Sequence, residues 1–414
     1  MKGKKKLKAK NGSQANKSVL KPEAKFSYAA NIKVVGVGGG GCNAVSRMKD
    51  SGTLRGVDFI AINTDAQDLD YCSAKKRLYI GKNLTRGLGT GMNPELGRQA
   101  AEENRSEIVE SLRGADLVFV TAGLGGGTGS GASPVIAEAA REVGALTIAI
   151  VTKPFSFEGA QRSRIAGEAL TKLKDKVDTY IVVPNDRIFS IISKDTPILK
   201  AFNVIDDVLK SAVSGISELV ALHGLVNVDF ADVKAIMQNT GSAIVTSGLA
   251  AGQERAVNAV NSAINSPLLE TSLEGAKGVL FAVSGGKDLK MTEINDIAKI
   301  IGGSIDPGAR IIFGAYHDKK IKAGSLKVTL IATNFGEGGA LRAEEAAPTS
   351  LFQTATAEQK TERVISVSAP AFSVNKESKD EAKKEKDNKG VNPKKNADSV
   401  WDIPTFLRRN RRDQ

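Results

Sequence analysis

The chain has few of the residues that hold metal ions or disulfide frameworks. Its 414 residues include two cysteines, Cys42 and Cys72, and two histidines, His223 and His317. So few cysteines exclude a disulfide scaffold and are typical of a reducing cytoplasm. Without a Cys-x-x-Cys pair, a zinc site held by the protein alone is not expected. No apolar run approaches the roughly 18–20 residues that span a bilayer, and no secretory signal pattern follows Met1, so no transmembrane segment is expected.

Positive charge is present but is concentrated outside the segments that look folded. The formal net charge is +12, and residues 1–25 alone carry nine lysines and one glutamate. Residues 337–400 carry eleven basic and eleven acidic residues, which cancel. A protein that binds nucleic acid specifically needs a basic face on its folded part. We therefore expect no specific nucleic-acid partner, and we interpret residues 1–25 as a solvated, disordered basic tail.

What the chain does have is glycine, gathered in two loops. Gly36-Val-Gly-Gly-Gly-Gly41 follows the strand-like Ile32–Val35 and precedes a helical pattern, and it fits the dinucleotide spacing G-x-G-x-x-G. Gly123-Leu-Gly-Gly-Gly-Thr-Gly-Ser-Gly131 follows the apolar run Asp116–Thr121. Glycine lets backbone N–H groups approach an anion, and a helix N-terminus favours negative charge. Both loops therefore predict phosphate binding, and for either one alone a tight strand-to-helix turn without a ligand is the alternative.

The two loops together limit the classes of nucleotide-binding protein that the sequence fits. The sequence contains no G-x-x-x-x-G-K-[ST] motif, so a P-loop enzyme is not expected. An NAD-dependent dehydrogenase remains an alternative, but it needs an acidic residue at the end of the second strand. Asp58 lies near the required spacing but begins that strand. Two loops on either side of a strand-order switch favour a nucleotide with several phosphates.

Alternating apolar and helical segments predict an α/β fold. Strands are expected at 32–37, 57–62, 116–121, 145–151 and 178–183, with a helix over 94–112 between them, which indicates a Rossmann-like parallel sheet. A long apolar periodicity from Leu199 to His223 predicts a central helix. A second, smaller α/β unit follows, with strands near 277–283, 309–316 and 325–333, the last two antiparallel, and helices near 230–239, 254–264 and 291–301.

These patterns divide the chain into six parts. They are a disordered basic tail (1–30), a nucleotide-binding domain (31–198), a central helix (199–224), a second α/β domain (225–336), a disordered linker (337–400) and a C-terminal segment (401–414). The C-terminal segment gathers Trp401, Ile403, Pro404, Phe406 and Leu407, followed by four arginines. Apolar residues on a long tether, with no domain nearby to bury them, predict a docking peptide.

Several ordered motifs resemble those of the tubulin-like GTPases, and within them the FtsZ family of bacterial cell division. They are Gly-Gly-Gly-Thr-Gly-Ser-Gly, Asn63-Thr-Asp65, Gly87-Leu-Gly-Thr-Gly91, Thr152-Lys-Pro-Phe155, Asn185-Asp186, Asn227-Val-Asp-Phe-Ala-Asp232 and Trp401-Asp-Ile-Pro-Thr-Phe-Leu407. The resemblance covers about residues 31–336 and then the last dozen or so. It implies a GTPase that assembles into head-to-tail filaments, binds GTP or GDP with Mg²⁺, and acts in the cytoplasm at the mid-cell division site, near the inner face of the membrane.

The resemblance also assigns residues to the nucleotide. Gly39, Gly40, Gly41, Gly126, Gly127, Thr128 and Gly129 would hold the phosphates, with Gly89–Gly91 as a third wall. Cys42 would contact the nucleotide through its backbone, and Asn43 and Asn185 would add further contacts. Glu158 and Arg162 would reach the ribose and phosphates, although their spacing alone fits a simple helical ion pair. Asp207 would recognise guanine, with Phe202 stacking nearby and Asp206 in the neighbouring position.

Catalysis and partner binding are assigned to two other segments. Asp229 and Asp232, with Asn227 orienting them, would complete the site of the next subunit, while Asp229 also fits a plain helix N-cap. A non-catalytic, tubulin-like scaffold is the second alternative, against which these intact aspartates argue. Trp401, Asp402, Ile403, Pro404, Phe406, Leu407 and Arg408 would dock on membrane-tethering division proteins of the FtsA class. The metal ligands are not assigned.

Overall fold

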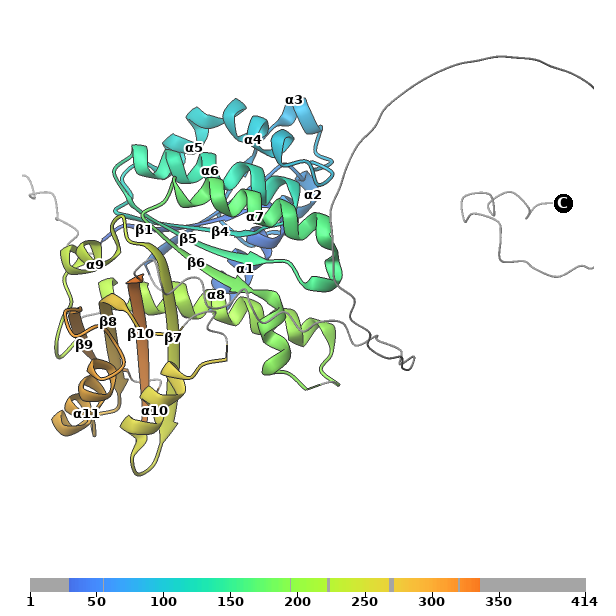
Figure 1. Ribbon diagram of the computed structural model, residues 1–414. Coiled ribbons are helices and arrows are strands. Elements are labelled where there is room, and N and C mark those ends of the chain that lie inside the picture. Colours follow the sequence, from blue (N-terminus) through green and yellow to red (C-terminus); the bar gives the residue numbers. More distant parts are fainter. Residues whose placement is uncertain are drawn as a thin grey trace, which may run out of the picture. The chain divides into compact units, whose positions relative to one another are not determined.

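The computed structural model describes residues 30–54, 56–193, 195–221, 224–267, 272–318 and 321–335 (Figure 1). All of them belong to one compact unit of the chain. The predicted N-terminal tail up to residue 29, the predicted linker and the predicted docking segment 401–414 lie outside the described residues.

A ten-stranded sheet runs through this unit in the order β3-β2-β1-β4-β5-β6-β7-β10-β8-β9. The first six strands in the chain pair only in parallel: β1 (Ile32–Val37), β2 (Val57–Asn63), β3 (Lys76–Tyr79), β4 (Leu117–Gly123), β5 (Leu146–Lys153) and β6 (Thr179–Pro184). The other four are β7 (Gly241–Ala251), β8 (Ala276–Gly285), β9 (Arg310–His317) and β10 (Ser325–Phe335). The two groups meet where β6 pairs with β7 over two register positions, Thr179↔Gly241 and Tyr180↔Ser242.

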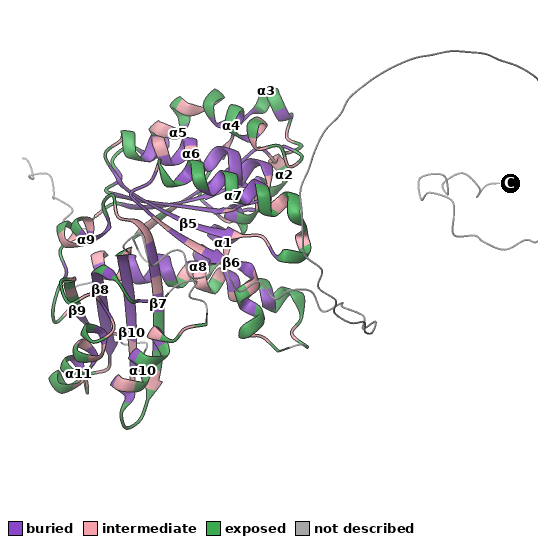
Figure 2. Cartoon of the chain, in the orientation of Figure 1, coloured by how far each residue is buried: buried purple, intermediate pink, exposed green. Residues whose placement is uncertain are grey.

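Helices cover both faces of the parallel part, as its continuous apolar strands require. The helical elements in this part are α1 (Gly38–Asp50), α2 (Ala66–Tyr71), α3 (Lys82–Thr85), α4 (Pro94–Glu103), α5 (Arg105–Leu112), α6 (Gly127–Glu142), η1 (Ser156–Glu158), α7 (Ala160–Lys174), η2 (Asn185–Ser190) and α8 (Ile198–Ala221). In Figure 1, α4 to α7 lie on one face, and α1 and α8 lie on the other. The strands between them are buried along most of their length (Figure 2).

The helix α8 links the two parts of the sheet. It starts after β6 and η2, at the carboxyl edge of the parallel strands, and runs back to their amino edge. Its 24 residues span about 36 Å at about 1.5 Å per residue. Leu209, Val213 and Ile216 on its buried face pack in one hydrophobic cluster with residues of β5, β8 and β10. The predicted central helix is therefore present, and residues 222–223 at its predicted end lie outside the described residues.

The second part of the sheet is covered on one face by α10 (Arg255–Ile264) and α11 (Met291–Gly302), while the short α9 (Phe230–Met237) leads from α8 into β7. The expected antiparallel direction of the last two strands is observed, but they are not neighbours. β10 pairs antiparallel with β7 and β8, and β9 pairs parallel with β8, so β8 separates them. Together these features confirm the predicted α/β fold with a parallel sheet, a central helix and a second α/β part.

Candidate functional site

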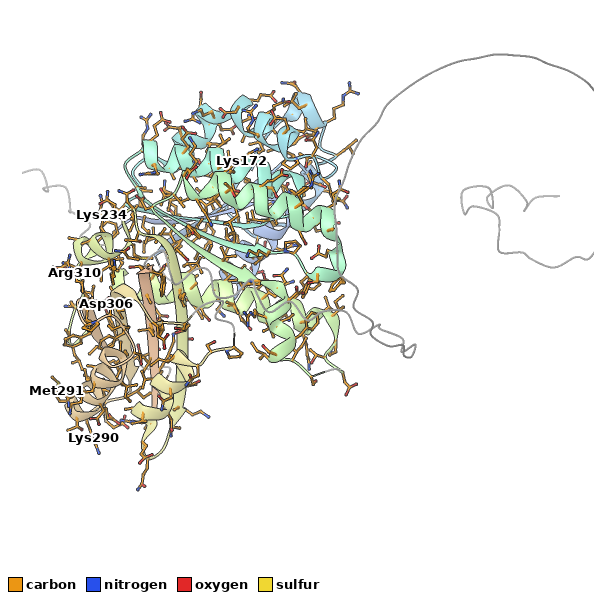
Figure 3. The ribbon with its side chains drawn as sticks, viewed as in Figure 1. Lys172, Lys234, Lys290, Met291, Asp306 and Arg310 are labelled. Carbon is orange, nitrogen blue, oxygen red and sulfur yellow. The ribbon has the colours of Figure 1, made fainter. Side chains whose placement is uncertain are left out.

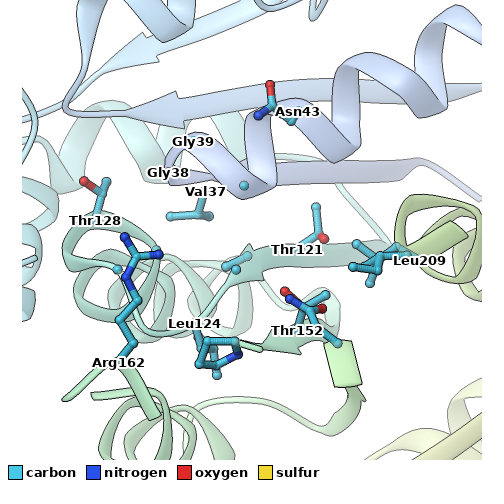
Figure 4. A pocket seen from close by; sticks show the side chains of 18 of the residues that line it. Val37, Gly38, Gly39, Asn43, Thr121, Leu124, Thr128, Thr152, Arg162 and Leu209 are labelled. Carbon is cyan, nitrogen blue, oxygen red and sulfur yellow. The ribbon is translucent and has the colours of Figure 1, made fainter. Parts of the chain in front are cut away.

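A pocket of about 460 Å³ opens at the carboxyl edge of the sheet, between β1 and β4. These two strands mark the switch in strand order, because β1 pairs with β2 on one side and with β4 on the other. Ligands of open α/β sheets bind at such switch points. Figure 4 shows Asn43 on the wall formed by α1, with Thr121 on β4 and Arg162 on another wall of the pocket.

The two glycine segments form the floor of this pocket by touching each other. A Cβ on Gly38 would lie 2.8 Å from the backbone nitrogen of Gly129, and Gly38 has a φ of +70°. A Cβ on Gly129 would lie 3.4 Å from the carbonyl oxygen of Val37 in the first segment, and 2.6 Å from the carbonyl oxygen of Gly123 within its own segment. No side chain fits at these contacts, so glycine is required for the two segments to pack backbone against backbone.

The same packing directs two helix N-termini at the pocket. α1 begins at Gly38 and α6 at Gly127, and neither N-cap residue, Val37 or Gly126, makes a side-chain capping hydrogen bond. The first N–H groups of a helix have no partner within the helix, and they carry the positive end of its dipole. Two uncapped N-termini at one pocket are the arrangement that binds a phosphate chain.

Two buried polar atoms in the pocket wall are unsatisfied. Thr121 Oγ1 and Asn185 Oδ1 have no hydrogen-bond partner among the described residues, and both residues line the pocket. A buried polar group without a partner costs about 1–3 kcal/mol. By contrast, Thr128 Oγ1 lies 2.7 Å from Thr64 Oγ1, which fixes the first turn of α6. The unpaired atoms indicate that the wall is built to meet polar groups of a ligand.

Most of the nucleotide contacts predicted from the sequence line this one pocket. They are Gly39, Gly40, Asn43, Gly126, Gly127, Thr128, Gly129, Glu158, Arg162, Asn185 and Phe202. Of the expected third wall, Thr90 lines the pocket, whereas Gly89 and Gly91 do not.

Three predicted contacts are not among the lining residues. A Cβ on Gly41 would lie 2.4 Å from the carbonyl oxygen of Thr121, so this glycine allows α1 to approach β4. Cys42 is 2 % exposed, and its Sγ lies 3.9 Å from the carbonyl oxygens of Gly36 and Ile62. Asp207 is exposed and lines a smaller neighbouring hollow between the last turn of α1 and the first half of α8, which Arg47 and Asp206 line as well.

Asp206, next to Asp207, lies in the pocket instead. Phe202, Ile205, Asp206 and Leu209 all line it, at the spacing i, i+3, i+4 and i+7 that shares one helix face. The Asp206 side chain is 15 % exposed and forms an ion pair with Arg47 of α1, which also lines the pocket. Arg47 was not predicted from the sequence, and Asp206 was named only as the neighbour of Asp207. The helical spacing from Phe202 is the sequence signal that places Asp206, and not Asp207, on the side of α8 that lines the pocket.

An aromatic and charged wall closes the pocket on the side of α7. Phe155 and Phe202 meet edge to face with ring centroids 5.9 Å apart, which fixes Phe202 at the pocket rim. Arg162 Nη1 lies 2.5 Å from Glu158 Oε2, and Glu158 Oε1 accepts a hydrogen bond from the Phe155 N–H at 2.9 Å. Glu158 at the end of η1 and Arg162 in α7 therefore form the expected ion pair and also line the pocket, and their contact with the ribose and phosphates stays a prediction.

The predicted catalytic residues lie elsewhere, beyond the far end of α8. Asn227 Oδ1 accepts a hydrogen bond from the Gly224 N–H at 2.6 Å, which closes the turn that follows the helix. Asp229 is the N-cap residue of α9, but its side chain makes no capping hydrogen bond, and it is exposed. Asp232 Oδ1 lies 3.7 Å from Arg310 Nη2, at the start of β9. Arg310 is labelled in Figure 3 beside α9.

Within the described ranges, no group of three or more histidines, cysteines or acidic residues is arranged to hold a metal ion. A magnesium ion that accompanies a nucleotide is held largely by phosphate oxygens and water. In the same ranges, no helix has the length and apolar character to cross a membrane.

Comparisons with known proteins agree with this geometry. Residues 31–193 match the GTPase domain of the Tubulin/FtsZ family, and residues 241–336 match the C-terminal domain of the FtsZ family. An FtsZ dimer from M. jannaschii is 46 % identical, with a TM-score of 0.69, over 73 % of this chain and 88 % of that one. A GTPγS-bound CetZ2 protofilament from Haloferax volcanii is 23 % identical, with a TM-score of 0.64, over 74 % of this chain and 94 % of that one, and shows the shared fold.

Gly126 provides a clean test of the phosphate cradle. A Cβ there meets nothing within 4 Å, and its φ of −90° suits alanine. We expect Gly126→Ala to place a methyl group in the pocket and to weaken GTP binding by about tenfold or more, equivalent to about 1.4 kcal/mol. Unfolding free energy should change by less than about 0.5 kcal/mol. Equilibrium titration with GTP and denaturant unfolding measure the two effects.

The matched control is Gly167→Ala on the exposed face of α7, where a Cβ also meets nothing within 4 Å. It should leave GTP affinity unchanged. Gly127→Ala is unsuitable, because its Cβ would lie 2.1 Å from Thr90 Oγ1 and would disturb the fold itself. Equal GTP affinity for Gly126→Ala and the parent chain would contradict the cradle.

The two neighbouring aspartates make opposite predictions for base recognition. A carboxylate accepts hydrogen bonds from guanine N1–H and N2–H₂, and hydrogen bonds to a charged group contribute about 1.5–3 kcal/mol. We expect Asp206→Asn to weaken GTP binding by about tenfold to a hundredfold and to favour xanthosine triphosphate, whose O2 can accept from the new amide. Asp207→Asn should leave both affinities unchanged. If Asp207→Asn alone shifts the preference, the assignment from helical phase is wrong.

Proposed function

The chain belongs to the Tubulin/FtsZ family, and on that premise we propose that it is a GTPase that assembles head to tail and hydrolyses GTP between successive subunits. The GTP or GDP would occupy the pocket between β1 and β4. Its phosphates would lie against the glycine segments at the N-termini of α1 and α6, and its base against Phe202 and Asp206.

The observation that carries this proposal is the separation of the pocket from the acidic loop. The pocket is lined by the first part of α8, and Asp229 and Asp232 follow its far end. From Asp206 to Ala221 the helix alone covers 15 residues, or about 22 Å. One chain therefore does not bring its own aspartates to its own pocket. A second copy stacked head to tail would bring them there, and such a contact repeats into a filament.

The chemistry of phosphoryl transfer fits this division of roles. It needs a positioned water and stabilised charge rather than a covalent partner on the protein. Backbone N–H groups of Gly39, Gly40 and Gly126 to Gly129 would hold the phosphate oxygens. Asp229 and Asp232 from the neighbour would orient the water and accept its proton, with Asn227 fixing the loop. A Mg²⁺ ion bound with the nucleotide would supply further charge neutralisation.

The dehydrogenase alternative has lost its support. The acidic residue that follows β2 is Asp65, and its carboxylate is already used to cap α2, accepting from the N–H groups of Gln67 and Asp68. Neither Asp65 nor Asp58 lines the pocket. A single measurement distinguishes the non-catalytic scaffold from our proposal: the parent chain should release phosphate from GTP if it is a GTPase, and should not if it is only a scaffold.

We further propose a cellular role in bacterial division. The motivation is the family, together with the apolar segment Trp401–Leu407 at the end of a long polar stretch. This segment would bind membrane-tethering proteins of the FtsA class and hold the filaments at mid-cell, near the inner face of the membrane. Self-association has a precedent in the FtsZ dimer and the CetZ2 protofilament.

Catalysis between subunits predicts a specific behaviour of Asp232→Ala. The variant should bind GTP normally and assemble, while hydrolysis falls about a hundredfold or more, since one lost transition-state contact often costs about 2.7–4 kcal/mol. In mixtures at fixed total protein, the variant should lower the GTPase rate more than in proportion to its fraction, because its long-lived filaments retain parent subunits.

The control for that mixing experiment is a Gly126→Ala variant, whose pocket is impaired but whose acidic loop is intact. Combined with Asp232→Ala, it should restore some hydrolysis, because each chain supplies the half that the other lacks. A strictly proportional loss in the first mixture, with filament content unchanged and no recovery in the second, would show that each chain is catalytically self-sufficient.

Removal of residues 401–414 should separate docking from catalysis. We expect the shortened chain to keep its GTPase rate and assembly within about twofold, because its pocket and acidic loop are untouched, and to lose binding to an FtsA-class protein. Sedimentation, phosphate release and a binding titration measure the three properties. A drop in hydrolysis as large as that of Asp232→Ala would refute a role confined to docking.

A further inference from the structure

A second hollow, of about 440 Å³, lies at the amino edge of the parallel sheet, away from the nucleotide pocket. Its charged lining residues are Lys33, Lys49, Lys75, Lys76 and the single acidic residue Asp58. We call it the lysine hollow. Its remaining lining includes the apolar side chains of Leu54, Val57, Phe59 and Ile60. It therefore combines an excess of positive charge with an apolar wall.

The register of the outer strands creates this hollow. β2 begins at Val57, but β3 pairs with it only from Ile60, which lies opposite Lys76. The first three residues of β2 thus have no strand partner on their outer side among the described residues. The last turn of α1 supplies Lys49 on one face, and the end of α5 supplies Ser111 on the other. Because the edge strand β3 is short, it leaves a space beside the start of β2 that side chains surround but do not fill.

The positive charge in the hollow is only partly neutralised by the surrounding protein, because Asp58 is the one acidic lining residue, and the charges of Asp58 and Glu110 both act on Lys33. Lys33 is 9 % exposed, and its Nζ donates to the carbonyl oxygens of Ser111 and Arg113 at 3.0 Å each. Burial, and then the nearby charge of Lys76, lower the pKa of Lys33. Lys49 Nζ donates to the carbonyl oxygen of Ser73. Lys75 and Lys76 are exposed and form no ion pair in the described part of the chain.

A purely structural role explains only part of this cluster. Lys33 satisfies two carbonyl groups at the end of α5, as basic side chains at helix C-termini commonly do. Lys75 and Lys76 form no such hydrogen bond among the described residues, and the charge of Lys76 repels that of Lys33. Like charges that face one space favour an anion within it, and a concave site strengthens that attraction.

We propose that the lysine hollow binds an anion that carries a phosphate group on an apolar body. Ammonium groups bind phosphate as point charges, and the half-buried Phe59 with Leu54 and Val57 offers contact area to the rest of the molecule. The volume lies within the roughly 300–1,000 Å³ typical of small-ligand pockets. A soluble phosphate ester and the headgroup of an anionic phospholipid share this chemistry.

The test uses the full chain loaded with GDP, so that the nucleotide pocket is filled. Phenyl phosphate is titrated calorimetrically, with phenol as the uncharged comparison. In parallel, the protein is sedimented with phosphatidylcholine vesicles that contain or lack phosphatidylglycerol. The variant is Lys75→Gln with Lys76→Gln, and the matched control is Lys172→Gln with Lys299→Gln, which removes the same charge from exposed positions elsewhere.

We expect phenyl phosphate or the anionic vesicles to bind the parent chain and the control alike. Binding should weaken at least tenfold in the Lys75→Gln, Lys76→Gln variant, while GDP affinity and thermal unfolding stay unchanged. Leu54→Trp, which fills the hollow without altering charge, should weaken binding of the soluble ester likewise. Binding in the first arm identifies a soluble ester, and binding in the second alone identifies a lipid headgroup.

Two results would overturn the inference. One is the absence of binding in both arms. The other is binding that the control substitutions weaken as much as the substitutions in the hollow, because the attraction would then reflect net charge and not this site.

Discussion

The close backbone contact between the two glycine segments is the constraint on which the rest of the structure depends. It lets α1 and α6 start side by side at the point where the strand order reverses, with Gly38 against Gly129. Both helices then present unpaired N–H groups to one pocket. A single methyl group on Gly38 would meet the backbone of Gly129, separate the helices and remove the convergence of their N-termini. Phosphate binding is thus a consequence of how tightly the sheet and its helices pack.

The length and direction of α8 impose the second constraint. Because it returns from the carboxyl edge to the amino edge of the sheet, the residues that contact a nucleotide and the residues that follow the helix lie at opposite ends. A rigid helix of this length cannot bend to join them. In the proposed reaction, the pocket and the acidic loop of one molecule lie too far apart to act together, and a second copy stacked head to tail would supply the missing half. The proposed filament would thus follow from the geometry of one helix.

Sequence patterns predicted the strands that are buried along their whole length. They failed for elements whose structure depends on contacts with distant residues and not on local sequence preference. The five long parallel strands were found within about two residues, because strands buried on both faces read as apolar runs.

β7 was missed because Gly241–Ala251 is rich in small residues. Gly248 shows why: a Cβ there would lie 2.0 Å from the carbonyl oxygen of Ala259 in α10, so the helix requires a bare strand. β3, four residues with two exposed basic ones, carries no strand signal at all. The single helix predicted over 94–112 is broken at Asn104, whose side chain accepts a hydrogen bond from the Gly81 N–H, a long-range contact that no local pattern encodes.

Sequence motifs predicted the glycine segments of the nucleotide pocket, but not which side chains of α8 line it. Glycine spacing located the cradle, because it reflects a local requirement of the backbone. Which of the two neighbouring aspartates lines the pocket depends on helical phase, because one residue changes the direction of a side chain by about 100° on a helix of about 3.6 residues per turn. Asp206 and Asp207 are the same residue type but lie on different sides of α8. Asp206 forms an ion pair with Arg47 at the pocket, whereas Asp207 is exposed. No sequence motif predicts the lysine hollow, since its residues come from β1, α1, β2, α5, the start of β3 and the residues just before β2 and β3. It exists only because β3 begins three residues after β2 in their shared register, which is a property of the folded sheet and not of any one segment.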